Sequence, residues 1–224
     1  GEDLEQRVRL RSELGGGAGF DDSVYAVATL LNGDVVAGGR FRAVDGTAAG
    51  GIARWDGTAW RLMGSGVPNL GIIYSLLVLP DGNLVAGGSF ASIGSIAANG
   101  VGLWDGSAWH SVGTGFTGVV RSLAGIPSGG FVAAGYGLLG GGSFAAEWDG
   151  QAWSRLDPGT GSGVFVNTVQ MLPTGDLVVG GGFSTLGGVS ANGIARFDGV
   201  RWWPVGAGAD SVVDSLALDR NGNL

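Results

Sequence analysis

The chain has 224 residues, of which 45% are hydrophobic, 14% are charged and 48 are glycine. A net charge of -7 gives it no electrostatic reason to bind nucleic acid or an anionic membrane surface. The absence of cysteine excludes disulfides, thiol catalysis and thiolate metal sites.

From Val24 onwards, one pattern recurs about every 47 residues. Each copy begins with a short apolar run, a turn glycine and a second apolar run that ends in small residues. The turn glycines are Gly33, Gly82, Gly129, Gly175 and Gly222. Asn-Gly and Asp-Gly pairs favour tight hairpins, because such turns need positive φ. These features predict the first two strands of a repeated antiparallel unit.

A connection of about a dozen residues then leads to a second hairpin signal, in which an aromatic residue precedes Asp-Gly. The copies lie at Trp55–Gly57, Trp104–Gly106, Trp148–Gly150 and Phe197–Gly199. A second tryptophan follows each copy at a fixed offset: Trp60, Trp109, Trp153 and Trp202. This regular placement predicts packing between units rather than ligand platforms. Trp203 lies outside the pattern and is the exception.

Each unit therefore consists of four short antiparallel strands, and no segment shows helical periodicity. Four-stranded units repeating at this length are typical of β-propeller blades, which bury their faces by stacking around an axis. The sequence predicts an all-β propeller with four complete repeats and a partial fifth. No apolar run approaches the ~20 residues of a membrane span, so no direct membrane insertion is expected.

The motif formed by Leu84–Gly88, then Trp104-Asp105 and then Trp109 resembles the kelch motif. Kelch repeats usually carry Tyr at the first aromatic position, where this chain has Trp or Phe. The regular Asp-Gly turns and the high glycine content look more like bacterial kelch-type repeats than animal scaffold proteins. This resemblance implies a propeller fold and suggests a bacterial, extracytoplasmic protein.

The chain is interpreted as a single propeller domain or a fragment of one. The repeat units cover residues 20–66, 67–115, 116–161 and 162–208, with a partial fifth unit at 209–224. Residues 1–19 are expected to form an outer closing strand. In one interpretation this strand completes the fifth blade and closes a five-bladed ring.

In the favoured alternative, the sequence is a piece of a longer propeller, because it stops at Leu224 in an unfinished strand and natural folds avoid an unpaired edge. A third interpretation pairs that edge between two copies of the chain, which would be a route to self-association.

The best candidate for a site is one position, the second residue of the first strand in each unit. It is occupied in turn by Tyr25, Tyr74, Arg121, Asn167 and Asp214, while its neighbours stay apolar or small. Variation at a fixed position is expected of a binding ring near the propeller axis. The alternative is that the position is solvated and unconstrained.

Kelch-type domains commonly bind partners at the face built by the connections between blades and between the second and third strands. The resemblance therefore implies a role for Arg40, Arg42 and Asp45, which carry most of the charge of these connections.

If a five-bladed ring closes, four carboxylates outside the turns would gather near one mouth of the channel. They belong to Asp21, Asp22, Asp210 and Asp214. Oxygen-rich clusters suit Ca²⁺, so a calcium site is the metal candidate, with simple solvated acidity as the alternative. No other cofactor is expected. His110 is the only histidine, and an exposed structural position is expected for it.

The sequence favours a non-catalytic, kelch-like propeller that acts as a protein-binding or structural scaffold module. The alternative is a carbohydrate-binding propeller that uses Trp203 and the tyrosine rings as platforms. A propeller hydrolase or lyase comes third, because only carboxylates are available at the channel mouth. No catalytic residue is identified.

Overall fold

The computed structural model describes residues 19–68, 70–116, 118–127, 129–138, 142–156 and 165–224. Within these residues every helix or strand element is a β-strand, and the strands form four four-stranded and three two-stranded antiparallel sheets. None of these residues forms a helix that is long and apolar enough to cross a membrane. The prediction of an all-β fold built from four-stranded units is confirmed.

Each four-stranded sheet is one blade, and its strands pair in chain order. Blade 1 consists of β1 (Val24–Thr29), β2 (Val35–Gly39), β5 (Ile52–Trp55) and β6 (Trp60–Leu62). Blade 2 consists of β7 (Ile72–Val78), β8 (Leu84–Ser89), β11 (Val101–Trp104) and β12 (Trp109–Ser111). Blade 3 consists of β13 (Val119–Gly125), β14 (Phe131–Leu138), β15 (Gly142–Trp148) and β16 (Trp153–Arg155). Blade 4 consists of β17 (Phe165–Met171), β18 (Leu177–Gly182), β21 (Ile194–Phe197) and β22 (Trp202–Pro204).

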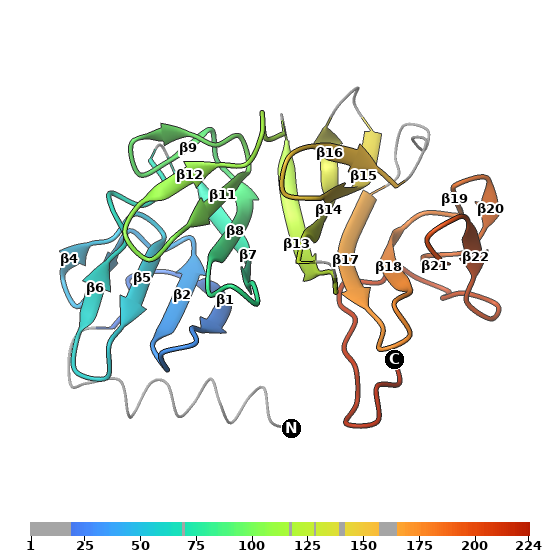
Figure 1. The fold of residues 1–224 in the computed structure, drawn as a ribbon, viewed down its shortest axis with the longest axis horizontal. Coiled ribbons are helices and arrows are strands. Elements are labelled where there is room, and N and C mark those ends of the chain that lie inside the picture. The colour runs from blue at the N-terminus through green and yellow to red at the C-terminus, as the bar shows by residue number, and fades with distance from the viewer. Residues whose placement is uncertain (1–18, 69, 117, 128, 139–141, 157–164) are drawn as a thin grey trace.

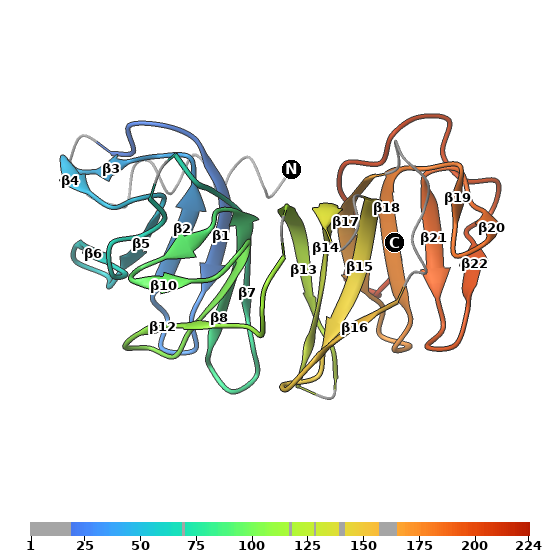
Figure 2. The same cartoon turned by 90° about the horizontal axis from the view of Figure 1, so that it is seen from above.

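The blades follow one another in an arc, with the first strand of each blade innermost (Figures 1 and 2). β1 contacts β7, β7 contacts β13, and β13 contacts β17. The last strand of each blade lies on the outside. This arrangement is the side-by-side stacking that the repeat predicts.

The small residues at the end of each second strand let the next blade approach closely. At the first glycine of the pair, an added Cβ would meet a β-branched side chain of the next unit. It would lie 2.7 Å from Ile73 at Gly38, 2.7 Å from Val120 at Gly87 and 2.5 Å from Val213 at Gly180. The apolar residues of one blade therefore pack directly on the bare backbone of the preceding blade.

The outer strands are joined by the second tryptophan of each copy. The indole N–H donates a hydrogen bond to a carbonyl oxygen at the end of the outer strand of the preceding blade. The pairs are Trp109 with Met63 at 2.8 Å, Trp153 with Val112 at 3.0 Å and Trp202 with Leu156 at 2.9 Å. The predicted role of these tryptophans in packing between units is confirmed.

The connections between the second and third strands contain small hairpins, which the sequence analysis treated only as connections. They are formed by β3 (Ala43–Val44) with β4 (Thr47–Ala48), β9 (Ser92–Ile93) with β10 (Ile96–Ala97), and β19 (Thr185–Leu186) with β20 (Val189–Ser190). In blade 3 the pairing of β14 with β15 extends to Leu138 and Gly142 instead. The shorter connection there becomes a longer hairpin.

The fifth unit begins beside blade 4. Gly222 donates its N–H to the Asp219 carbonyl oxygen at 3.0 Å, and Asp219 donates to Asn223 at 2.7 Å, which repeats the turn around Gly33. Residues 211–224 contain no strand in the structure, although Val213 occupies the same place against blade 4 as its counterparts do against blades 1 and 2.

The predicted closing strand lies almost entirely outside the described residues. Its last residue, Gly19, accepts a hydrogen bond from the Asp45 backbone N–H and donates its own N–H to the Asp45 carboxylate. The next residue, Phe20, forms a bridge with Val44 and packs edge-on against Trp60, with 4.9 Å between ring centroids. Gly19 and Phe20 therefore belong to blade 1, and closure of the ring stays a prediction.

Candidate functional site

The variable position near the axis is the site of a β-bulge in every complete blade. The pairing register shifts between the residues that flank it, as at Val24 and Ala26. The bulge residues are Tyr25, Tyr74, Arg121 and Asn167. A bulge leaves its extra residue unpaired and redirects its side chain, which is why such features often occur beside binding sites.

The second glycine of each pair makes room for the bulge. A Cβ added at Gly39, Gly88 or Gly181 would collide with a carbonyl oxygen of the innermost strand in the same blade. The sequence analysis identified the variable position but missed the bulge. The conserved second glycine opposite a varying residue was the signal that could have revealed it.

In blades 2, 3 and 4 a hydroxyl group fixes the bulge to the next unit, whereas blade 1 has Ala26 at this position. The hydroxyl of the residue after the bulge accepts a hydrogen bond from a backbone N–H of the next unit. The backbone N–H of Leu123 donates to Ser75 Oγ at 3.2 Å, that of Val169 to Ser122 Oγ at 3.1 Å and that of Leu216 to Thr168 Oγ1 at 3.2 Å. The backbone at the bulge is therefore similar from blade to blade, although the bulged side chain varies. We call this bulged end of the innermost strands the axial mouth.

Three of the five predicted ring residues contact one another at the axial mouth. The rings of Tyr25 and Tyr74 lie 5.5 Å apart between centroids, and the Arg121 guanidinium carbon lies 4.6 Å above the Tyr74 ring. Tyr25 is 43% exposed. We call these three residues the mouth cluster. It presents two aromatic rings and one cation on a rigid backbone.

The other two predicted ring residues form a separate pair. Asn167 Nδ2 donates to Asp214 Oδ1 at 2.9 Å and to the Val213 carbonyl oxygen at 3.4 Å. In the structure, the five predicted positions therefore form two separate groups, one of three residues and one of two.

Arg40 lies beside the mouth cluster and holds Asp22. Its Nε and Nη2 donate to the two carboxylate oxygens of Asp22 at 2.9 and 3.0 Å. This pair, together with the Ser23 N–H, lowers the pKa of Asp22 to about 2. The pKa of Arg40 is raised, first by Asp22 and to a smaller extent by the phenols of Tyr25 and Tyr74. Arg40 therefore lies beside the mouth as one half of an ion pair with Asp22.

Arg42 and Asp45 make contacts that stabilise the first connection. Arg42 Nη2 donates to the Gly71 carbonyl oxygen at 2.7 Å, which ties this connection to the segment before β7. Asp45 has a positive φ of 47° and accepts a hydrogen bond from the Gly19 N–H. Their binding role stays a prediction.

The structure does not bring the four calcium candidates together. Asp21 Oδ1 accepts the backbone N–H groups of Arg42 and Ala43, which lowers its pKa, and Asp22 is held by Arg40. Asp210 lines a separate shallow pocket beside the start of the fifth unit. Figure 1 shows the last residues of the chain beside β17 and β18 of blade 4, away from β1. Within the described residues, no group of three or more acidic or histidine side chains could hold a metal ion.

His110 and Trp203 occupy equivalent positions on outer strands. His110 Nε2 lies 2.6 Å from Asp105 Oδ2, and Trp203 Nε1 donates to Asp198 Oδ2 at 2.6 Å. Both side chains thus reach the aspartate of the preceding turn. The guanidinium carbon of Arg201 lies 3.8 Å from the Trp203 ring centroid and covers one face. Trp203 is therefore less open than the proposed sugar platform requires.

No protein-family model and no curated protein sequence matches the chain. Solved structures share its fold. The extracellular domain of the putative one component system BT4673 from B. thetaiotaomicron aligns with a TM-score of 0.60 at 11% identity, over 93% of this chain and 26% of that chain. The gluconolactonase XC5397 from Xanthomonas campestris aligns with a TM-score of 0.56 at 17% identity, over 88% of this chain and 65% of that one.

An inactive virginiamycin B lyase from Staphylococcus aureus aligns with a TM-score of 0.54 at 14% identity, over 84% of this chain and 58% of that chain. The chain thus spans about a quarter of the first protein and less than two thirds of the two enzymes. At these identities the similarity shows the β-propeller fold alone. The kelch resemblance stays an interpretation of the sequence.

Proposed function

We propose that this protein is a non-catalytic binding module whose axial mouth recognises a partner protein. One observation carries the proposal: the bulged position changes from tyrosine in blades 1 and 2 to arginine in blade 3 and asparagine in blade 4, while the bulge itself is kept in all four blades. A side chain that changes on a backbone feature that does not change is suited to recognition.

The chemistry of the mouth cluster fits a protein partner. Tyrosine and arginine are enriched at interface hot spots, because each combines a large contact area with few, well-directed polar groups. Tyr25 and Tyr74 provide the rings, and Arg121 provides the cation, because Arg40 is already paired with Asp22. In a protein with a net charge of -7, this local positive charge favours a partner surface with carboxylates.

The same region offers little for acid or base catalysis. The single histidine, His110, lies on outer strand β12, far along the blade from the mouth. At the mouth, Asp22 is held by Arg40 and Asp214 by Asn167. These contacts support a binding role over the lyase or lactonase activities named for two of the proteins that share the fold.

A carbohydrate ligand is the second candidate, and exposed Tyr25 is the observation that favours it. Sugars stack on exposed aromatic rings, and Tyr25 and Tyr74 are inclined at 37° to each other in a shallow aromatic surface. A glycan array separates the two candidates, because a carbohydrate-binding protein should respond on it and a protein scaffold should not.

The test compares the wild-type protein with a variant in which Tyr25, Tyr74 and Arg121 are all changed to serine. Leu62→Ser is the control, because Leu62 is an exposed apolar residue on outer strand β6, away from the mouth. Each protein is immobilised and exposed to an extract of the cells that produce it, and captured proteins are quantified by mass spectrometry.

We expect one partner to be enriched by the wild type and the control and to fall at least tenfold with the triple variant. Equal capture by all three proteins would contradict the proposal. A glycan-array response that the triple variant loses would replace the protein partner with a carbohydrate.

A further inference from the structure

Blade 3 carries an acidic residue at a strand position where blades 1 and 4 carry arginine. The third residue of the third strand is Arg54 in blade 1 and Arg196 in blade 4. Each pairs with an aspartate in the first turn of its own blade: Arg54 Nε lies 3.5 Å from Asp34 Oδ2, and Arg196 Nη1 lies 2.6 Å from Asp176 Oδ2. This place in the repeat is thus built to hold a guanidinium beside a carboxylate.

In blade 3 the same strand position is Glu147, and the turn position is Gly130. An added Cβ at Gly130 would collide with the Trp148 carbonyl oxygen, so this turn has no room for a charged side chain. Glu147 has no hydrogen-bond or ion-pair partner among the described residues. Blade 3 therefore holds the carboxylate of the pair without its cation.

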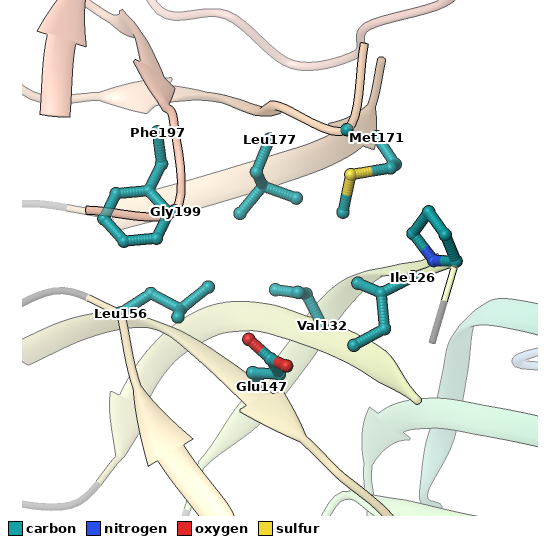
Figure 3. Close-up of a pocket in the computed structure, with 10 residues that line it drawn as sticks. Ile126, Val132, Glu147, Leu156, Met171, Leu177, Phe197 and Gly199 are labelled. Atoms are coloured by element: carbon teal, nitrogen blue, oxygen red, sulfur yellow. The ribbon is translucent and has the colours of Figure 1, made fainter. Parts of the chain in front are cut away.

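Glu147 points into a pocket of about 320 Å³ between blades 3 and 4 (Figure 3). Apart from Glu147, the pocket is lined mainly by apolar side chains: Ile126, Val132 and Leu156 from blade 3, and Met171, Leu177 and Phe197 from blade 4. Ile126 and Gly199 place it beside the turns, at the opposite end of the strands from the axial mouth.

Beside the pocket, blade 4 carries smaller residues than blade 3 at two equivalent positions. Blade 3 places Trp148 and Phe131 against blade 2, where both belong to a packed cluster with Leu103. Blade 4 has Phe197 and Leu177 at these positions. Val132 and Leu177 are still buried in a cluster that joins blades 3 and 4, and the pocket lies at the edge of this cluster.

We propose that this pocket binds an arginine side chain of a partner protein. The guanidinium would pair with Glu147, and the aliphatic stem would lie against Leu156, Met171 and Phe197. Arginine fits because its planar fork can meet both carboxylate oxygens, and because arginine is what this repeat position uses in blades 1 and 4. The apolar surroundings strengthen the ion pair by limiting its exposure to water. This proposal does not depend on the axial mouth.

The protein itself provides a sensitive probe of the pocket. It has two methionines: Met171 lines the pocket, and Met63 is buried in blade 1 at 1% exposure. With ¹³C-labelled methionine methyl groups, the Met171 signal reports binding and the Met63 signal reports whether the fold is intact. The probes are acetyl-Ala-Arg-Ala-amide and the same peptide with citrulline, which has the shape of arginine without its charge.

We expect the arginine peptide to shift the Met171 signal saturably while the Met63 signal stays in place. The citrulline peptide and the Glu147→Gln variant should each weaken binding at least tenfold. Phe197→Trp, which restores the indole of the other copies, should abolish the response by filling the pocket. The triple serine variant of the mouth cluster should respond as the wild type does.

The proposal fails if Met171 does not respond, or if the citrulline peptide and Glu147→Gln behave like the arginine peptide and the wild type. Sedimentation tests the other occupant. A concentration-dependent dimer that Glu147→Gln dissociates would make a second copy of this chain the occupant and overturn the assignment to a partner protein.

Discussion

The outer and inner strands of the blades use the repeat in opposite ways. On the outside, each copy keeps a tryptophan, and Trp109, Trp153 and Trp202 donate equivalent hydrogen bonds to the preceding blade. On the inside, each copy keeps a bulge but changes the bulged side chain, from Tyr25 to Asn167. The repeat thus keeps the tryptophans that join neighbouring blades, and it varies the side chains that face the axis.

The largest loss of stability is expected when a side chain is added at the glycine opposite a bulge. In Gly88→Ala, the new methyl group would collide with the Ile72 carbonyl oxygen, so we expect a loss of about 3 kcal/mol in the free energy of unfolding. Gly125→Ala is the control, since the nearest atom to its new methyl is Leu77 Cδ1 at 3.8 Å. Denaturant unfolding measures both, and equal stability of the two variants would contradict the account.

The outer strands should be sensitive to a smaller change. Trp109→Phe removes the hydrogen bond to the Met63 carbonyl oxygen from a tryptophan that is 6% exposed, and we expect a loss of about 2 kcal/mol. Trp203→Phe should cost less than about 0.5 kcal/mol, because its N–H bonds to an exposed carboxylate on a turn. Similar losses in the two variants would show that the repeated tryptophans have no special role between blades.

The hydroxyl groups behind the bulges should contribute less again. Ser122→Ala leaves the Val169 N–H without its partner, and we expect a loss of about 1 kcal/mol in thermal or denaturant unfolding. Blade 1 already has Ala26 at this position, so Ala26→Ser is the reverse experiment. No change with Ser122→Ala would mean that the bulges need no support from the neighbouring blade.

Acid should weaken the turns at the outer ends of the blades. The pKa of Asp198 is lowered to about 2 by the Trp203 N–H and by the backbone N–H groups of Arg201 and Val200. A carboxylate in the unfolded chain titrates near about 3.9, so its contribution is present above pH 4 and is lost as pH falls towards 2. Asp198→Asn should reduce the slope of the unfolding free energy over this range. A flat profile in the wild type would contradict the prediction.

Most of the fold was predictable because its signals are local and repeated. Asn32-Gly33 and the other turn pairs placed the first hairpins, and the spacing of Trp104 and Trp109 placed the second. The small hairpins such as β9 with β10 were missed because two-residue strands have no alternating pattern. The closing strand expected at residues 1–19 lies outside the described residues except for Gly19, and it stays a prediction.

The sites were predictable only in part. Variation at one position identified the mouth cluster, but the stacking of Arg121 on Tyr74 depends on how neighbouring blades are placed, which a single sequence does not encode locally. The pocket at Glu147 depends on the same kind of contact. Its signals were present as two departures from the repeat, Phe197 in place of Trp and Glu147 in place of Arg, and only the structure places them in one seam.

The most direct test of the account measures stability and binding on the same variant. In the protein with Tyr25, Tyr74 and Arg121 changed to serine, the free energy of unfolding should stay within about 1 kcal/mol of the wild type, because these side chains are exposed or half-buried and only one ring contact and one cation–π contact are lost. Binding of the captured partner should fall at least tenfold. A loss of several kcal/mol in stability, or unchanged binding, would show that the axial residues serve the fold and not recognition.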